Sequence, residues 1–178
     1  MSDAPSLESG FPAISDCNTR ILILGSMPSI TSLEQQQYYA HPRNAFWPIM
    51  CAVFDIDRNK TYQQRCELLI KNHLAVWDSI QACQRQGSLD QSIDSSSMTA
   101  NDFTLFFQHH LDIEKILFNG TKAEQVFNRF VLPTLNEQLA ALPMLRLPST
   151  SPAHATMNFE QKYQLWSQAL AINKANIL

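Results

Sequence analysis

The chain has 178 residues, of which 45% are hydrophobic and 16% are charged, so it has the length of one domain and enough apolar residues for a core. This composition excludes an intrinsically disordered protein, and no apolar run approaches the roughly 20 residues that a membrane-spanning helix requires. The formal net charge of −3 argues modestly against a general nucleic-acid coat protein, although a local basic patch is compatible with DNA binding. The first residues lack the basic and apolar segments of a signal peptide, so we expect a cytoplasmic protein.

The four cysteines are widely spaced and include no C-x-x-C pair. This spacing argues against a zinc site or an iron–sulfur cluster, and we expect no bound metal. Without a secretion signal, the cysteines are expected to be buried and reduced.

Residues 1–18 are polar and contain two prolines, which predicts an N-terminal tail that docks on the domain through Phe11. Residues 19–178 are expected to form a single domain.

Short apolar runs predict the strands of a mainly parallel sheet. The apolar runs occupy residues 21–24, 74–77, 116–118 and 144–147. Continuous runs of this kind are typical of parallel strands, which are covered on both faces.

Helical patterns separate these runs, so the sequence predicts an α/β fold. Apolar residues recur with helical spacing over residues 46–53 and 62–70. Further helix starts are predicted by capping boxes, in which Thr or Asn is followed three residues later by Glu or Gln: Thr31 with Glu34, Thr121 with Glu124, and Asn158 with Gln161. The last helix is expected to bury four apolar side chains: Phe159, Tyr163, Trp166 and Leu170. Residues 85–101, rich in Ser, Gln and Asp, predict a surface loop.

Small, polar and turn-forming residues follow each predicted strand. They occupy residues 25–29, 78–79, 119–121 and 148–152. Ligands of open parallel sheets bind beyond the carboxyl ends of the strands, so these segments are expected to converge on one crevice. Each segment alone is also explained by ordinary turn chemistry, but all of them at one sheet edge predict a binding site.

The segment over residues 37–47 combines aromatic rings, a cation and an amide. It runs Gln37-Tyr38-Tyr39-Ala40-His41-Pro42-Arg43-Asn44-Ala45-Phe46-Trp47. One explanation is structural, a loop that enters an amphipathic helix with Asn44 as its N-cap. A cap alone does not require adjacent tyrosines beside an arginine, so the segment is also a candidate for a binding site.

Five motifs occur in order along the chain. They are Gly25-Ser26-Met27-Pro28-Ser29, the segment from Tyr38 to Trp47, Trp77-Asp78, Phe118-Asn119-Gly120, and Leu147-Pro148-Ser149-Thr150-Ser151-Pro152-Ala153-His154. In this set the chain resembles the uracil-DNA glycosylase superfamily, and within it most resembles the hypoxanthine (deoxyinosine) DNA glycosylase branch. The resemblance extends from about residue 11 to the C-terminus. Mismatch-specific uracil glycosylases share the Ala-His-Pro-x-Asn-x-Phe-Trp portion.

The resemblance implies a three-layer α/β/α domain with a short, mainly parallel four-stranded sheet. It also implies an enzyme that flips a deaminated base out of DNA and hydrolyses its N-glycosidic bond, with no metal or organic cofactor. The departing base becomes an anion, which the backbone N–H of Ser26 or Met27 is expected to stabilise. Tyr39 matches the position at which relatives stack an aromatic ring on the flipped base. Asp78 lies where uracil enzymes place a base-binding Asn and is expected to accept from the N–H of the base, with Asn119 as a nearby donor; an Asp at a strand end also caps helices.

Two departures from the family pattern define the catalytic candidates. Met27 occupies the place of an Asp or Asn that positions the attacking water, and Asn44 is the natural substitute because an amide can orient water. Leu147 replaces a His that stabilises the leaving base. His154 is the candidate to replace that function, and we expect it near the first turn of a helix that starts after Ser151.

The resemblance makes damaged DNA, single- or double-stranded, the expected partner of a monomeric protein that does not bind membranes. Ser149, Thr150 and Ser151 suit contacts with a DNA phosphate, although the same residues could simply cap a helix. Arg43 is expected on a basic rim that faces the DNA. The sequence therefore predicts a hypoxanthine DNA glycosylase. The alternatives are a mismatch-specific uracil-DNA glycosylase and a catalytically silent α/β module that binds a nucleotide or nucleic acid, since two catalytic side chains of the family are replaced.

Overall fold

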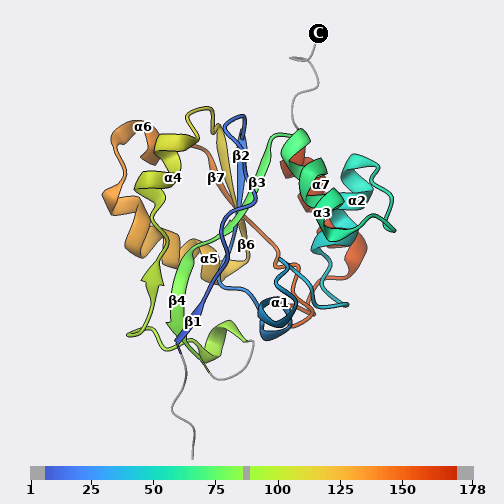
Figure 1. Cartoon of the computed structure of the whole chain (residues 1–178), viewed down its shortest axis with the longest axis horizontal. Coiled ribbons are helices and arrows are strands. Elements are labelled where there is room, and N and C mark those ends of the chain that lie inside the picture. Colours follow the sequence, from blue (N-terminus) through green and yellow to red (C-terminus); the bar gives the residue numbers. More distant parts are fainter. Residues whose placement is uncertain (1–6, 86–88, 172–178) are drawn as a thin grey trace, which may run out of the picture.

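The computed structural model describes residues 7–85 and 89–171, and it has a central sheet between two groups of helices (Figure 1). The strands are β1 (Leu7–Ser9), β2 (Ile21–Gly25), β3 (Leu74–Asp78), β4 (Ile80–Gln84), β5 (Thr99–Ala100), β6 (Lys115–Asn119) and β7 (Met144–Leu147). The α-helices are α1 (Ile30–Gln35), α2 (Phe46–Phe54), α3 (Tyr62–Lys71), α4 (Phe103–His109), α5 (Thr121–Val126), α6 (Glu137–Ala140) and α7 (Phe159–Leu170). Short 3₁₀ helices, η1 (Asp90–Ser92) and η3 (Leu132–Thr134), and a π-helical stretch, η2 (Phe127–Val131), complete the described elements.

The central sheet confirms the predicted α/β fold. In the described part of the chain its strand order is β3-β2-β6-β7, and each neighbouring pair is parallel. The chain enters the sheet at β2, continues to β3 on one side, and then crosses to β6 and β7 on the other side. The connections after β2 and β6 therefore leave in opposite directions, which opens a crevice at the carboxyl ends of these strands.

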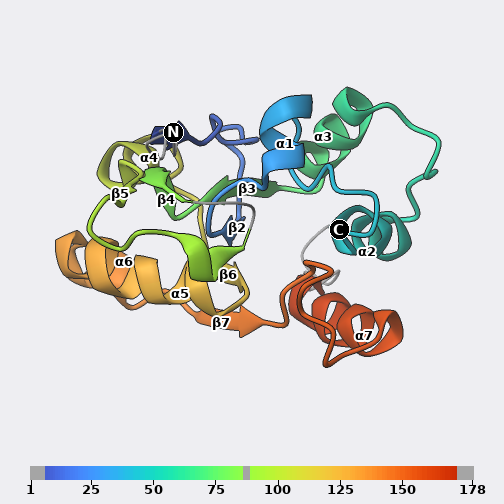
Figure 2. The same ribbon diagram turned by 90° about the horizontal axis from the view of Figure 1, so that it is seen from below.

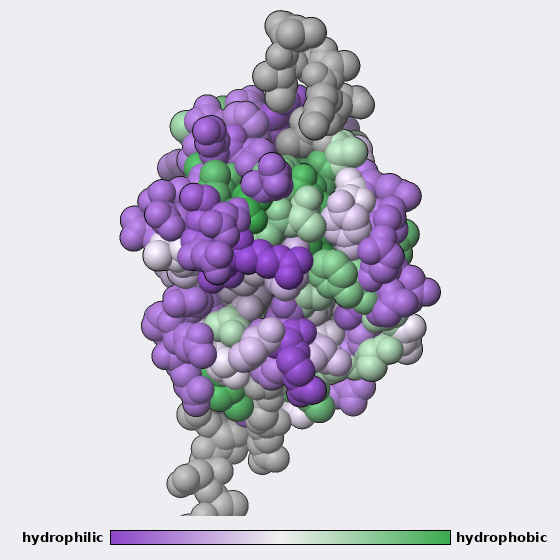
Figure 3. All heavy atoms as spheres, turned by 90° about the vertical axis from the view of Figure 1, so that its right-hand side faces the viewer, coloured by the Kyte–Doolittle hydropathy of each residue, from purple (hydrophilic) through white to green (hydrophobic). Residues whose placement is uncertain are grey.

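Both faces of the sheet are covered, as the continuous apolar runs predict. Successive strand residues point to opposite faces. In β2, Ile23 packs in a cluster with α2, α3 and α7, whereas Leu24 packs in a cluster with α4 and α5. These two helix groups lie on opposite sides of the sheet in Figures 1 and 2. The outer face of the layer with α2, α3 and α7 is mostly hydrophilic, with apolar side chains visible between the hydrophilic groups (Figure 3).

Two of the predicted helix starts are wrong by one or two residues. Helix α1 begins after Ser29, whose Oγ accepts a hydrogen bond from the N–H of Ser32 (3.2 Å), so Thr31 is not its cap. Helix α5 begins after Gly120, which has a φ of 98° and no side chain to cap the helix, so Thr121 is not its cap either. In both cases a residue one or two positions before the expected box already adopts a non-helical cap conformation.

The predicted start of α7 is correct. Asn158 and Gln161 form both hydrogen bonds of a capping box, at 2.9 and 3.0 Å. Trp166 is fully buried, but Phe159 is 41% exposed, so its expected burial is wrong. Phe159 is the first residue of the helix, and its ring stacks on that of Tyr163 in the same helix, with ring centroids 6.2 Å apart.

A small antiparallel sheet, in the order β1-β4-β5, is absent from the sequence prediction. It places Arg85 and Ile93 in buried positions, so the interpretation of residues 85–101 as a surface loop is wrong at these residues. Residues 86–88 lie outside the described part. The strands are short and pair across long sequence separations, as Leu7 with Gln84, so no local pattern indicates them.

The N-terminal segment contacts the domain at several points. Strand β1 pairs with β4, the Phe11 ring meets Tyr38 edge-on with ring centroids 5.2 Å apart, and Ile14 exchanges backbone hydrogen bonds with Val76. Residues 1–6 of the expected tail lie outside the described part. No helix of the described residues combines the length and apolarity needed to cross a membrane.

The four cysteines are free thiols, but their predicted burial is only partly correct. Cys51 and Cys83 are buried and Cys66 is half-buried, whereas Cys17 is exposed. Cys17 lies in the turn before β2, where the polar neighbours Asp16 and Asn18 are hydrogen-bonded to each other.

Candidate active site

A cavity of about 680 Å³ opens at the carboxyl ends of the parallel strands, the edge seen from below in Figure 2. Segments that follow β2, β3, β6 and β7 line it, together with the segment before α2. The cavity brings together all predicted site residues except Arg43: Ser26, Met27, Tyr39, Asn44, Asp78, Asn119, Ser149, Thr150, Ser151 and His154.

Gly25, Tyr39 and Asp78 meet in one part of this cavity, which we call the floor. A Cβ atom on Gly25 would lie 2.4 Å from Asp78 Oδ1 and 3.2 Å from the Tyr39 hydroxyl, so the glycine makes room for both polar groups. Asp78 Oδ2 and the Tyr39 hydroxyl are buried and have no hydrogen-bond partner within the described residues. A buried polar group without a partner costs about 1–3 kcal/mol, so such atoms mark a place where a ligand can form hydrogen bonds.

The surroundings of the Asp78 carboxyl favour its neutral form. Its side chain is 3% exposed, and burial is the main cause that raises its pKa from 3.8 to about 8. The nearby Asp90 carboxylate raises this pKa further, whereas Arg85 lowers it. The Arg85 guanidinium is partly engaged, because Nε donates to Glu8 (2.7 Å) and Nη2 to the Pro28 carbonyl, whereas Nη1 is buried without a partner within the described residues.

Tyr39 has a strained backbone. Its φ of 56° lies in the left-handed region, which is uncommon for a bulky residue and often marks a functional site. One face of its ring stacks on Phe46, with ring centroids 4.0 Å apart. Asn119 faces the Tyr39 hydroxyl, but the two groups are not aligned as a hydrogen bond. Burial raises the pKa of the phenol, so Tyr39 is a neutral donor.

Asn44 is hydrogen-bonded to the start of α2 and also lines the cavity. Its Oδ1 accepts from the N–H of Phe46 (3.0 Å), while Ala45 holds the N-cap position and no side chain caps the helix there. The N–H of Ala45 donates to the carbonyl of Thr150 (2.9 Å), which ties this segment to the loop after β7. No hydrogen bond among the described residues uses the Asn44 amide nitrogen. The amide can therefore contact both the helix and a ligand.

Asn119 and Thr150 bind each other. Asn119 Nδ2 donates to Thr150 Oγ1 (2.9 Å), and the N–H of Thr150 donates to Asn119 Oδ1 (2.8 Å). Thr150 is 1% exposed, so its hydroxyl lies inside the protein and joins the ends of β6 and β7. One N–H of Asn119 remains for a ligand.

The loop that follows β7 consists of turns, so the helix expected after Ser151 is absent and α7 begins only at Phe159. Ser149 Oγ accepts from the N–H of Ser151, and Ser151 Oγ accepts from the N–H of Ala153, both at 3.2 Å. His154 is half-buried in this loop, and its Nε2 lies 3.3 Å from Thr156 Oγ1. Hydrogen bonds from backbone N–H groups to serine side chains stabilise these turns, and the helix predicted from Pro152 does not form.

Neighbouring residues of the segment 25–29, which begins at the last residue of β2, have different contacts. Met27 is buried in the small cluster with Ile80 and Val126, so its thioether belongs mainly to the core. Ser26 Oγ donates to Asp90 Oδ1 (2.6 Å). Backbone bonds from Ser79 and Ile80 to the carbonyls of residues 25 and 26 fix the turn.

Sequence reasoning missed two charged residues that line the cavity, Asp90 and Lys122. Burial raises the pKa of Asp90, while its hydrogen bond from Ser26 and the charge of Lys122 lower it. Lys122 directly follows the segment after β6, so its position could have suggested it. Asp90 lies in the stretch interpreted as a loop, and no sequence signal distinguishes it from its neighbours.

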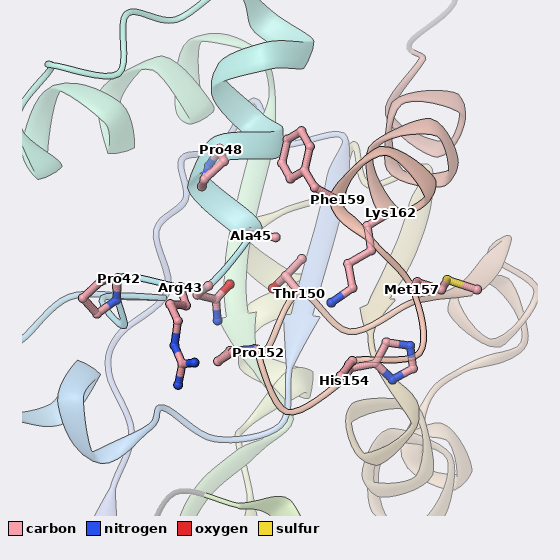
Figure 4. Close-up of a pocket in the computed structure, with 12 residues that line it drawn as sticks. Pro42, Arg43, Ala45, Pro48, Thr150, Pro152, His154, Met157, Phe159 and Lys162 are labelled. Atoms are coloured by element: carbon pink, nitrogen blue, oxygen red, sulfur yellow. The ribbon is translucent and has the colours of Figure 1, made fainter.

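Arg43 lines a second, adjacent pocket of about 300 Å³ (Figure 4). Pro42 and Arg43 lie on one side of this pocket, and Phe159 and Lys162 of α7 on another. Arg43 is exposed, whereas the Lys162 ammonium donates to the carbonyl of Ser151 (3.3 Å), and burial lowers its pKa. The two pockets share several lining residues: Asn44, Thr150 and His154.

No group of three or more His, Cys, Asp or Glu side chains within residues 7–85 and 89–171 is arranged to hold a metal ion.

Comparison with known proteins identifies the family. The family model of the uracil DNA glycosylase superfamily matches residues 11–172. The chain belongs to this superfamily. Among its relatives is a hypoxanthine DNA glycosylase from Methanosarcina barkeri (strain Fusaro / DSM 804), 37% identical over 115 residues, which are 64% of this chain and 72% of that protein. A hypoxanthine DNA glycosylase from Methanosarcina acetivorans is 38% identical over 118 residues, 66% of this chain and 73% of that protein.

The fold of this superfamily member is similar to a solved structure. The solution NMR structure of a candidate uracil DNA glycosylase from Methanosarcina acetivorans has a TM-score of 0.74 and 32% sequence identity. The match covers 93% of this chain and 99% of that chain. The predicted membership and the predicted three-layer architecture are therefore both confirmed.

Proposed function

We propose that this superfamily member hydrolyses the N-glycosidic bond of hypoxanthine in DNA, after the nucleotide has rotated out of the duplex. The observation that carries the proposal is the cavity whose floor holds unpartnered polar groups of Asp78 and Tyr39 and whose lining includes Asn44. A flipped base requires an enclosed pocket with polar groups at its edge. The names of the Methanosarcina relatives favour hypoxanthine as the base.

Cleavage leaves negative charge on the base and positive charge on the sugar. In this proposal, Tyr39 and the backbone N–H groups of Ser26 or Met27 donate hydrogen bonds that stabilise the leaving base, and Asp78 and Asn119 contact its edge. Asn44 orients the attacking water through its amide. An amide is a poor base, but a dissociative cleavage needs a water that is held in place rather than deprotonated early. His154 lines the same cavity and is the second candidate for this step.

The DNA backbone is proposed to run past the mouth of the cavity. Arg43 is exposed beside it, and the half-buried Ser149 and Ser151 follow β7 at the same edge, so we assign these residues to phosphate contacts. Thr150 is buried and is assigned to positioning the loop rather than to the DNA contact expected from the sequence. We propose that the protein acts as a monomer in the cytoplasm.

Single-turnover cleavage of oligonucleotides that carry hypoxanthine, uracil, xanthine or mismatched thymine tests the proposal. We expect the abasic product to form fastest from hypoxanthine, in single- or double-stranded DNA. Faster cleavage of mismatched uracil would support the mismatch-specific alternative, and no cleavage of any substrate by folded protein would support the silent binding module.

The Asn44→Ala variant tests the proposal that Asn44 orients the attacking water. We expect the single-turnover rate to fall by roughly 10² to 10⁴, the usual range for a positioned polar group. Loss of the bond to the Phe46 N–H should also cost about 1 kcal/mol of unfolding free energy. Asn44→Asp is the matched control, because a carboxylate can still accept from Phe46 and hold a water; it should retain more activity than the alanine variant. A near-normal rate in folded Asn44→Ala would transfer the role to His154 or Asp78.

A further inference from the structure

We propose that Asp78 binds the flipped base as a neutral carboxylic acid, which donates one hydrogen bond to the base and accepts another from it. This inference rests on the proposed function, because it assigns how the floor of the same cavity holds its base. The ligand chemistry is a lactam edge, a ring N–H beside a ring C=O.

The geometry presents this carboxyl to a ligand. Asp78 ends β3, lines the cavity and is 3% exposed, yet Oδ2 has no partner within the described residues. The adjacent Tyr39 hydroxyl is also unpartnered. Gly25 leaves the space that Oδ1 occupies. The floor therefore holds two buried polar groups whose bonding capacity is unused by the protein.

The charges around Asp78 disfavour its ionised form. Asp90 of η1 adds negative charge, and the phenols of Tyr38 and Tyr39 are neutral neighbours on the segment before α2. Arg85 follows β4 and is bound to Glu8, and Lys122 of α5 acts on Asp90. No cation among the described residues forms an ion pair with Asp78. Burial of the Asp78 carboxyl and the negative charge of Asp90 together raise the pKa of Asp78 to about 8.

A neutral carboxyl matches a lactam edge in both directions. Its C=O accepts from the ring N–H, and its O–H donates to the ring C=O. A carboxylate accepts only, so it would face the lone pairs of the ring oxygen without a proton between them. It would also repel the negative charge that develops on the leaving base, whereas the O–H of the acid stabilises that charge. The sequence-based expectation that Asp78 only accepts is changed by this inference.

The pH dependence of Asp78→Asn distinguishes the two forms. A carboxamide donates and accepts as the neutral acid does but does not titrate. We expect Asp78→Asn to cleave hypoxanthine DNA within about tenfold of the wild-type rate at pH 7, whereas Asp78→Ala should lose about 10² to 10³. Above pH 8 the wild-type single-turnover rate should fall about tenfold per pH unit relative to Asp78→Asn. Ionisation of the substrate affects both proteins equally, so the ratio of their rates isolates Asp78.

A second measurement separates this inference from the proposed function. The infrared difference spectrum between wild type and Asp78→Asn should contain a carboxylic-acid C=O band at pH 7 that disappears above pH 8. Absence of this band, or equal pH profiles for wild type and Asp78→Asn, or an Asp78→Asn variant as inactive as Asp78→Ala, would overturn the inference. If the band is present but no deaminated base is cleaved, the proposed function fails, and with it the assignment of the acid to base binding, while the neutral state of Asp78 remains established.

Discussion

Gly25→Ala should disturb the floor of the cavity more than its single added methyl group suggests. The new Cβ would lie 2.4 Å from Asp78 Oδ1, a distance that non-bonded atoms do not tolerate, and 3.2 Å from the Tyr39 hydroxyl. Gly25 is buried in β2 and pairs with Asp78 across the sheet, so the backbone has little freedom to move apart. The Asp78 carboxyl must therefore rotate away from its position.

The expected cost is about 1–3 kcal/mol of unfolding free energy, the usual range for overpacking a core. Urea denaturation measures this cost, and single-turnover cleavage measures the displacement of the carboxyl. Because Asp78→Ala removes the colliding oxygen, the stability cost of Gly25→Ala should shrink by at least about 1 kcal/mol in that background. Gly10→Ala is the matched control, since the atom nearest to the new Cβ, outside the adjacent residues, would be the Ile80 carbonyl oxygen at 3.4 Å.

Two results would refute the reasoning. If Gly25→Ala leaves stability and cleavage at wild-type levels, the floor is not packed as described. If its cost is the same with and without Asp78→Ala, the strain does not arise from the carboxyl.

The charges of the site lead to two further predictions. The folded-state pKa of Asp78 lies above its ordinary value, so the folded state keeps a proton that the unfolded state releases, and unfolding free energy should fall between pH 4 and pH 8 by up to about 1.4 kcal/mol per pH unit. Denaturation of wild type and Asp78→Asn across this range checks the slope, which should be smaller in the variant because only the contribution of Asp78 is removed; an equal slope in both would contradict a raised pKa of Asp78. Arg43→Gln should weaken DNA binding and reduce the slope of log affinity against log salt by about one. Arg20→Gln is its control, because Arg20 precedes β2 at the opposite sheet edge and pairs with Glu114; equal salt slopes for wild type and Arg43→Gln would remove Arg43 from the DNA contact.

The sequence predicts the parallel strands well because a strand buried on both faces requires a continuous apolar run. Leu22 and Ile23 show the reason, since each packs on a different face of the sheet. The convergence of most site residues follows from the same topology, because the carboxyl ends of parallel strands meet at one edge. This part of the site could be predicted without knowledge of any side-chain position.

The remainder depends on interactions between distant segments. Strand β1 depends on β4, which pairs with it, and Asp90 lines the cavity with its carboxylate hydrogen-bonded by the distant Ser26. The ionisation state of Asp78 is set by burial and by charges that several elements bring together. The predicted starts of α1 and α5 are wrong for a local reason. Ser29 and Gly120 precede the expected caps and already have the backbone conformation of an N-cap.

The pairing of Asn119 with Thr150 joins two segments that are synthesised at different times. The floor residues Gly25, Tyr39 and Asp78 all leave the ribosome before β7. The loop after β7 is made later, and it supplies both partners for the Asn119 amide and the carbonyl that binds the N–H of Ala45. A nascent or truncated chain that ends before residue 144 therefore exposes the edge of β6 and lacks the loop that lines the other side of the cavity. The lining of the cavity is therefore complete only after translation has passed His154.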